Sequence, residues 1–118
     1  MKILVVDDSP TMRRIIIGNL VRMGHAEVLE AEDGLAGLEK LDQGGVDLII
    51  TDWDMPEMDG IAFARAVRSR GATMPILMVT THAATQDIVQ ALEAGVNTYV
   101  VKPFTQESLR EKIDSLLG

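Results

Sequence analysis

The stretch TDWDMPEMDG, residues 51–60, places four carboxylates around a proline, directly after the apolar run VDLII. Carboxylates at the end of a buried strand can bind a hard cation or attack as nucleophiles. They can also form a solvated turn and nothing more. We expect Asp59 to cap the helix that follows and Glu57 to be solvated, which leaves Asp52 and Asp54 available for chemistry.

Polar side chains also follow three other apolar runs. Asp7 and Asp8 follow ILVV (3–6), Thr80 and Thr81 follow ILMV (76–79), and Lys102 and Pro103 follow TYVV (98–101). Taken singly, each has an ordinary explanation, because an aspartate can cap a helix, a threonine can lie in a turn and a lysine can be solvated. Their chemistry therefore depends on whether the fold brings them together.

Five short apolar runs alternate with five helical patterns, and this alternation predicts the fold. The runs are 3–6, 28–31, 46–50, 76–79 and 98–101. Four are almost continuously apolar, as is typical of parallel strands covered on both faces, whereas 28–31 is the weakest and is expected at an edge. Right-handed crossovers then give an α/β fold of the (βα)5 kind, an open, doubly wound, parallel five-stranded sheet. The order 2-1-3-4-5 is the commonest way to wind five such units, and we expect it here.

The helices are predicted from caps and apolar spacing. Ser9–Pro10 begins the first helix, Gly24 closes it, and Thr105 caps the last. The predicted apolar stripes are Met12, Ile15, Ile16, Leu20 and Met23; Leu35, Leu38 and Leu41; Ile61, Ala64 and Val67; Ile88, Ala91 and Leu92; and Leu109, Ile113, Leu116 and Leu117. The arginines of the first and third helices are expected on solvated faces: Arg13, Arg14, Arg22, Arg65, Arg68 and Arg70.

In this strand order, strands 1, 3, 4 and 5 lie side by side, so their carboxyl ends share one edge of the sheet. Asp7, Asp8 and Asp52 would repel one another there, and a cation would offset that repulsion. The chain has no cysteine and only two histidines, far apart in sequence, so Mg²⁺ suits the site better than zinc. The expected ligands are Asp8 and Asp52 directly, Asp7 through water, and a carbonyl from the turn after Asp52.

The remaining groups at this edge suggest phosphoryl chemistry. Lys102 and the Thr80 hydroxyl supply a positive charge and a donor, which are the groups that neutralise and hold phosphoryl oxygens. A carboxylate facing them could attack phosphorus and form an aspartyl phosphate. Asp52 is the best candidate, because it ends the central strand between the acids of strand 1 and the Thr80–Lys102 pair.

Composition limits the class of protein. The 118 residues, 47% of them hydrophobic, fit one packed domain over 1–118. The net charge of −7 argues against nonspecific nucleic-acid binding. The chain shows neither a signal peptide nor an apolar run of membrane-spanning length, so we expect a cytoplasmic monomer without a membrane partner.

Four motifs, in order and correctly spaced, resemble the response-regulator receiver domain of two-component signalling. They are VVDDS (5–9), TDWDMPEMDG (51–60), MVTT (78–81) and YVVKPF (99–104). The resemblance covers the whole chain and implies a flavodoxin-like fold. The tryptophan after Asp52 and the YVVKPF segment are most similar to the single-domain chemotaxis regulators of the CheY type.

The resemblance implies a role for each residue of the predicted site. Asp52 would accept a phosphoryl group from a phosphohistidine of a sensor histidine kinase. Mg²⁺ would be held by Asp7, Asp8, Asp52 and the carbonyl of Asp54. Lys102 would bind the phosphoryl oxygens, while Thr80 would move its hydroxyl onto the phosphate and Tyr99 would rotate inward behind it.

The resemblance also implies how the signal leaves the domain. The output surface would be the fourth helix, fifth strand and fifth helix, with Ile88, Tyr99 and Lys112. A flagellar-motor switch protein is the expected target and a phosphatase a possible second partner, and the chain would catalyse only its own phosphorylation and dephosphorylation. The family often has a cis bond at the position of Lys102–Pro103.

Three positions are expected to modulate the chemistry. Asp54 puts a carboxylate where close relatives often have an amide, and His82 replaces what is often an acid or an amide. Thr81 stands where the family usually has alanine or glycine. We expect Asp54 and His82 to set the rate of autodephosphorylation, and Thr81 to narrow access to the phosphate. A solvated loop residue is the ordinary alternative for His82.

Other functions remain open at this point. The chain could be a stand-alone receiver in a phosphorelay unrelated to chemotaxis. A phosphatase of the haloacid-dehalogenase type could use Asp52 and Asp54 as its D-x-D motif, although that motif would end the first strand. A nucleotide or flavin module would need donors where DDSP offers charge repulsion. A receiver-like module without phosphorylation would have no need of the intact Asp52, Thr80 and Lys102 set.

Overall fold

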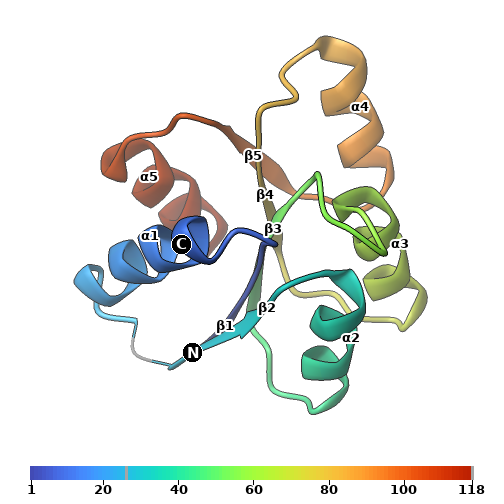
Figure 1. The fold of residues 1–118 in the computed structure, drawn as a ribbon, viewed down its shortest axis with the longest axis horizontal. Helices are drawn as coiled ribbons and strands as arrows, with labels where there is room; N and C mark the ends of the chain where they lie inside the picture. The colour runs from blue at the N-terminus through green and yellow to red at the C-terminus, as the bar shows by residue number, and fades with distance from the viewer. Residues whose placement is uncertain (26, 118) are drawn as a thin grey trace.

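The computed structural model describes residues 1–25 and 27–117, in which five parallel strands alternate with five helices (Figure 1). In chain order the elements are β1 (Lys2–Val6), α1 (Pro10–Arg22), β2 (Glu27–Ala31), α2 (Gly34–Asp42), β3 (Leu48–Asp52), α3 (Gly60–Ser69), β4 (Ile76–Thr80), α4 (Thr85–Glu93), β5 (Thr98–Val101) and α5 (Gln106–Leu117). The sheet order is β2-β1-β3-β4-β5, which confirms the predicted doubly wound fold and the edge position of the weakest strand.

The sheet separates two apolar clusters, one on each face. Helices α1 and α5 cover one face, and α2, α3 and α4 cover the other (Figure 1). Alternate residues of β1 divide between them, since Ile3 and Val5 pack toward α1 and α5 while Leu4 and Val6 pack toward α2 and α3. Burial on both faces is the reason that the central strands are continuously apolar.

Three predicted core positions prove to be exposed, which corrects those parts of the predicted stripes. Leu35 is 48% exposed and Leu92 50%, and Ile15 is also exposed. In α2 the reason is visible: the helix packs through Gly37, where an added Cβ would lie 2.9 Å from the Phe63 ring, so this close contact sets the buried face. Leu35 lies outside that face.

Side-chain caps begin four of the helices, and three of these caps were predicted. Ser9 accepts from the Met12 amide, and Asp59 accepts from the Ala62 amide. Thr105 caps α5 in a reciprocal pair with Ser108, and Asp33, which was not predicted, caps α2. Helix α4 differs, because Ala84 stands at its N-cap and offers no side-chain acceptor.

Arg68, predicted to be solvated, instead ties together three segments at the amino-terminal edge of the sheet. Its guanidinium donates to the carbonyls of Gly95, Ala72 and Met74 and to Oδ1 of Asn97, at 2.8–3.1 Å. Burial lowers the pKa of this guanidinium. The carboxyl end of α4 is therefore fastened to α3. Among the described residues, no helix is both long and apolar enough to cross a membrane.

Candidate functional site

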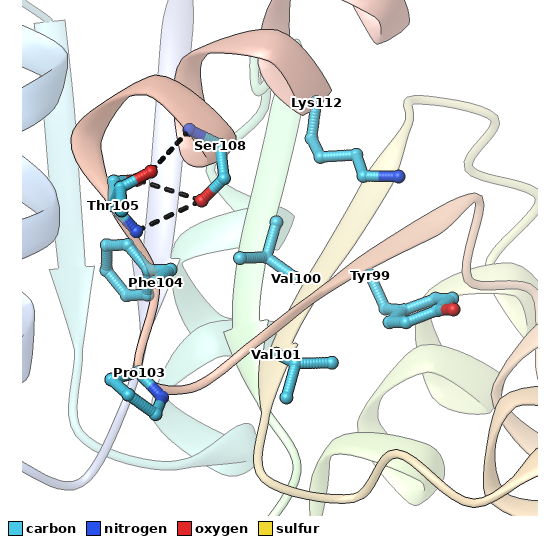
Figure 2. A pocket seen from close by; sticks show the side chains of 8 residues that line it. All are labelled: Tyr99, Val100, Val101, Pro103, Phe104, Thr105, Ser108 and Lys112. Atoms are coloured by element: carbon cyan, nitrogen blue, oxygen red, sulfur yellow. Dashed lines mark hydrogen bonds between the residues drawn. The ribbon is translucent and has the colours of Figure 1, made fainter.

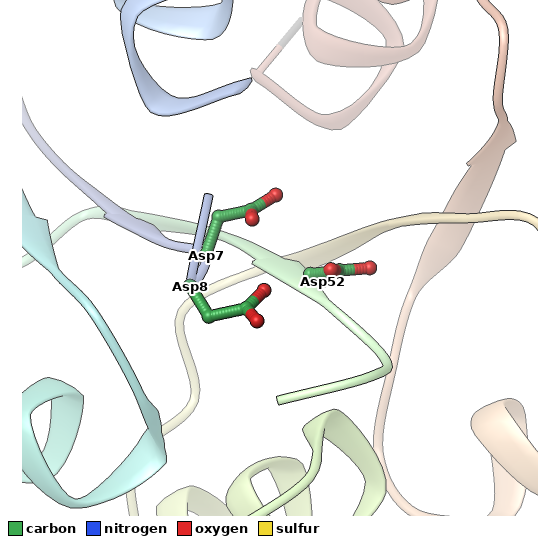
Figure 3. A group of neighbouring side chains, drawn as sticks. All are labelled: Asp7, Asp8 and Asp52. Carbon is green, nitrogen blue, oxygen red and sulfur yellow. The ribbon is translucent and has the colours of Figure 1, made fainter. Parts of the chain in front are cut away.

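Three carboxylates meet at the carboxyl edge of the sheet, as predicted. Asp7 and Asp8 follow β1 and Asp52 ends β3, and these two strands pair directly. One oxygen from each lies within 4.8 Å of the other two, and Figure 3 shows the carboxylates of Asp7 and Asp8 turned toward the side of the sheet where Asp52 lies. This arrangement could hold a metal ion, and Asp7, at 1% exposure, lies deepest in it.

One carboxylate oxygen of Asp7 accepts a hydrogen bond, and the other does not among the described residues. Its Oδ1 accepts from the Ser9 amide at 2.8 Å, whereas Oδ2 is buried without a hydrogen-bond partner among residues 1–25 and 27–117. Burial raises the pKa of this carboxyl, and the Ser9 amide opposes the rise. A buried acceptor without a donor is costly, so this oxygen is the strongest structural sign that the site could hold a cation.

Asp52 forms an ion pair with Lys102 at this edge of the sheet. Lys102 Nζ is 3.2 Å from Asp52 Oδ1 and 3.7 Å from Asp7 Oδ2. The Trp53 amide also donates to Asp52 Oδ1 at 2.8 Å. Burial raises the pKa of the Asp52 carboxyl, and Lys102 is the main opposing influence. The structure thus brings together Asp7, Asp8, Asp52 and Lys102.

Thr80 ends β4 at the same edge. In the pairing of β3 with β4, Asp52 is opposite Val79, so Thr80 lies one residue beyond it. Its Oγ1 accepts from the His82 amide at 2.9 Å, and its carbonyl accepts from the Lys102 amide at 2.8 Å. The Lys102–Pro103 bond is cis, as the family resemblance implied. The Thr80 hydroxyl therefore has its oxygen turned to the loop before α4.

The loop after Asp52 is held against the start of α3. The Gly60 amide donates to the Trp53 carbonyl at 2.7 Å. A Cβ on Gly60 would clash with the Asp52 carbonyl oxygen and lie 2.9 Å from Trp53 Cα, so a side chain does not fit here. This close approach of two backbones fixes the carboxyl end of β3, and with it the direction in which Asp52 leaves the strand.

Asp54 and His82 interact directly across the mouth of the site. His82 Nε2 lies 3.0 Å from both carboxylate oxygens of Asp54, and the His82 ring stacks on Trp53 with centroids 4.4 Å apart. On its other side, His82 Nδ1 is 3.9 Å from Asp87 Oδ2 on α4. The sequence predicted that Asp54 and His82 border the site but did not predict that they bind each other. Thr81, next to them, is exposed.

Tyr99 is half-buried on β5, on the far side of Thr80 from Asp52. Lys112 Nζ lies 5.8 Å from the centre of the Tyr99 ring. The two residues border a shallow hollow between β5 and α5 (Figure 2), whose lining residues are Tyr99, Val100, Val101, Pro103, Phe104, Thr105, Ser108 and Lys112. Tyr99 and Lys112 thus share one surface, on which Val101 is also exposed.

Arg13 is a residue of the site that sequence reasoning missed. Its Nη1 donates to the Asp7 carbonyl at 2.6 Å, and its Nε pairs with Glu30 Oε1 at 3.0 Å. Arg13 therefore supports the backbone that carries Asp7 and Asp8. The available signal was its position in the first turn of α1, one turn after the cap and close to the end of β1, but the length of the side chain let it be assigned to solvent.

Comparison with known proteins agrees with this geometry. Residues 3–114 match the sequence family described as the response regulator receiver domain. The chain is 51% identical to chemotaxis protein CheY1 of Helicobacter pylori, over all of this chain and 98% of that protein. It is 50% identical to chemotaxis protein CheY of Pseudomonas aeruginosa, over 98% and 95%. Its fold is similar to that of Vibrio cholerae chemotaxis protein CheY4, with a TM-score of 0.91 and 35% identity over 98% and 97% of the two chains.

Proposed function

The chain belongs to the response regulator receiver family, and on this premise we propose that Asp52 is the phosphoacceptor of a signalling switch. One observation carries the choice of residue: of the two clustered carboxylates that pair with Lys102, Asp52 lies nearer, at 3.2 Å against 3.7 Å for Asp7. Asp54 does not compete, because its exposed carboxylate is bound by His82, and this leaves the phosphatase alternative without support.

The proposed reaction is the transfer of a phosphoryl group from a phosphohistidine. An oxygen of the Asp52 carboxylate attacks phosphorus, the phosphorus–nitrogen bond breaks, and the imidazole of the donor leaves with the electron pair. Lys102 balances charge on the phosphoryl oxygens, and Thr80 donates its hydroxyl to one of them. The domain turns over no other substrate in this proposal, and the donor is a sensor histidine kinase in the cytoplasm.

The residues present fit Mg²⁺, because the buried, unpartnered Asp7 Oδ2 and two neighbouring carboxylates form an all-oxygen donor set. Asp7, Asp8, Asp52 and the Asp54 carbonyl would hold the ion. When bound, it would offset the negative charge of the carboxylates and of the incoming phosphoryl group. Asp7 and Asp8 would position it, and Arg13 and Ser9 hold Asp7 in place.

The output surface is proposed to be α4, β5 and α5. Ile88, Tyr99 and Lys112 lie on these elements, where Val89 and Leu92 also expose apolar side chains. A doubly charged phosphoryl group gives Thr80 and Lys102 partners that exist in one state only, so it shifts a two-state equilibrium of this surface. Chemotaxis is the proposed pathway, with a flagellar-motor switch protein as the target and a phosphatase as a further partner of the monomer.

Asp54, His82 and Thr81 are proposed to tune the lifetime of the phosphorylated state. Asp54 and His82 lie at the mouth of the site, where they can orient or exclude the attacking water. Autodephosphorylation should change in Asp54→Asn and in His82→Glu, measured by loss of the phosphoryl group in the absence of any phosphatase. Rates equal to that of the wild type in both variants would contradict this assignment.

The main experiment uses a small acyl phosphate as donor, with Mg²⁺, and intact-mass spectrometry as the readout. One phosphoryl adduct is expected on the wild type and none on Asp52→Asn. Asp59→Asn is the matched control: Asp59 lies in the same acidic stretch but caps α3, so its adduct should remain. An adduct that survives Asp52→Asn would refute the proposal. Trp53, the only tryptophan, gives a parallel fluorescence signal.

A further inference from the structure

The His82 side chain connects the loop between β4 and α4 to the loop after β3. His82 binds both carboxylate oxygens of Asp54 at 3.0 Å and stacks on Trp53, with an angle of 23° between the ring planes. Its side chain is about one-third exposed, which separates it from a freely solvated loop residue. Two loops that flank the phosphoacceptor are thus joined at a point outside the carboxylate cluster.

The same residue is joined to Thr80 through its backbone. The His82 amide donates to Thr80 Oγ1 at 2.9 Å, so the position of the hydroxyl and that of the loop are coupled. In the proposed switch, Thr80 Oγ1 moves onto the phosphoryl group and leaves this amide. The loop must then rearrange, and the contacts of the His82 side chain with Asp54 and Trp53 oppose that rearrangement.

Helix α4 begins without a side-chain cap among the residues that the structure describes. Its N-cap is Ala84, which provides no side-chain acceptor, and Ala91 is the buried residue of the helix. In its first turn, Asp87 Oδ2 lies 3.9 Å from His82 Nδ1. His82 therefore stands between the loop after β3 and the first turn of α4, where a change in its position reaches the helix directly.

We propose that the His82 side chain is a latch that holds the loop and the first turn of α4 in the resting arrangement. This inference rests on the proposed function, because it presupposes that the switch moves Thr80. The latch goes beyond the proposed function because it assigns to His82 a positioning role that acts before any phosphoryl group is present. Removing the side chain should then favour the signalling arrangement in the unphosphorylated protein.

The test uses Tyr99, the only tyrosine of the chain, as the reporter. The protein is labelled with 3-fluorotyrosine, and its fluorine resonance is recorded in the resting state and with Mg²⁺ and beryllofluoride, a mimic of the phosphoryl group. In His82→Ala without beryllofluoride, we expect the resonance to move toward the beryllofluoride position. The resting-to-signalling equilibrium should change by about tenfold, the factor typical of losing one strong hydrogen bond.

A double-mutant cycle separates the latch from a general loss of structure. If His82 acts through Asp54, Asp54→Asn should shift the resonance in the wild type and add little in the His82→Ala background. His82→Gln, which can still donate to Asp54, should recover part of the resting signal. His25→Ala is the matched control, because it removes the other imidazole of the chain, in the turn after α1, and should leave the resonance at the resting position.

The outcomes distinguish failure of the proposed switch from failure of the latch. A wild-type resonance that does not respond to Mg²⁺ and beryllofluoride would overturn the proposed switch, and the latch with it. A responsive wild type with His82→Ala at the resting position would overturn the latch alone. Equal shifts from Asp54→Asn in the presence and absence of His82 would also overturn it, because the two residues would then act independently.

Discussion

Helices α3 and α4 follow the two neighbouring strands that carry Asp52 and Thr80, yet they are attached to the sheet in different ways. Helix α3 has an aspartate cap, packs its first glycine on the backbone of β3, and buries Ile61, Phe63, Ala64 and Val67. Helix α4 has no side-chain cap and buries Ala91. From this difference we infer that α3, the fixed wall of the site, is held more firmly than α4, the movable wall, and we expect a change at Asp52 to be transmitted toward α4.

The largest effect is expected at the closest contact of the fixed wall. Gly60→Ala should lower the free energy of unfolding by about 3 kcal/mol, because the new methyl group meets the backbone of β3. Urea unfolding measures this change. Gly18→Ala, within α1 and facing open space, is the control and should raise stability by about 0.5 kcal/mol. A Gly60→Ala protein as stable as the wild type would show that this wall can yield.

A smaller loss is expected from removing the cap of the fixed helix. Asp59→Ala should cost about 1 kcal/mol of stability, because the Ala62 amide loses its acceptor. Glu111→Ala, which removes an exposed acid within α5, controls for the change in net charge. Hydrogen exchange should be faster in the first turn of α3 while α4 is unaffected. Equal acceleration in both helices would contradict the independence of the two walls.

The converse change should make the movable wall resemble the fixed one. Ala84→Ser places an acceptor at the extended N-cap position of α4 and should stabilise the protein by about 0.5 kcal/mol. Slower hydrogen exchange in the first turn of α4 is the measurement, and Ala83→Ser, one position outside the cap, is the control. If α4 amides exchange at the wild-type rate, the missing cap is not what loosens this helix.

The smallest change in stability per pH unit should come from the buried carboxyls of Asp7 and Asp52. Their effect is spread over the interval between the ordinary and the raised pKa values. Burial raises the pKa of Asp7 and of Asp52 above their values in the unfolded chain. The native state therefore binds more protons over that interval, and the free energy of unfolding decreases as pH rises through it. Without metal ions, the loss of stability from ionising these two carboxyls is complete above their raised pKa values.

Urea unfolding in a chelating buffer, repeated across the acidic range, measures this dependence. Asp7→Asn should flatten it by removing one of the two carboxyls, and Mg²⁺ should restore stability at neutral pH in the wild type. Asp59→Asn, an exposed carboxyl outside the cluster, is the comparison variant that matches the change in net charge. An unchanged slope in Asp7→Asn would show that burial of this carboxyl does not set the acid response.

The strand order was predicted correctly because five alternating strands and helices are most commonly wound as 2-1-3-4-5. The composition of the carboxylate cluster followed from that order and from the residues that end each strand. Ser9, Asp59 and Thr105 were correctly predicted as caps, since capping is a local interaction. The strand predicted at 46–50 begins instead at Leu48, because Asp47 turns its carboxylate to the Lys2 amide. Boundaries of this kind depend on neighbours distant in sequence.

Side-chain contacts between elements distant in sequence could not be predicted in the same way. Arg13, Arg68 and His82 each reach a partner on another element, and the length of an arginine or the position of an imidazole in a loop does not reveal that partner. The exposed Leu35 was misassigned for a related reason: the packing of a glycine, rather than leucine spacing, chose the buried face of α2. These errors concern which face of a helix packs against the rest of the fold, whereas the presence of each helix was predicted correctly.

The anchoring of α4 by Arg68 also determines where this chain can be divided. Its guanidinium closes residues 68–97 into a loop that contains β4 and α4, with the bonds to Gly95 at its base. A break in the exposed segment Ala83–Ala84 leaves that closure intact, so two fragments ending there keep a shared attachment point. A break after Gly95 leaves Arg68 and Gly95 in one fragment, so of these guanidinium bonds only the one to Asn97 would join complementary fragments made at that point.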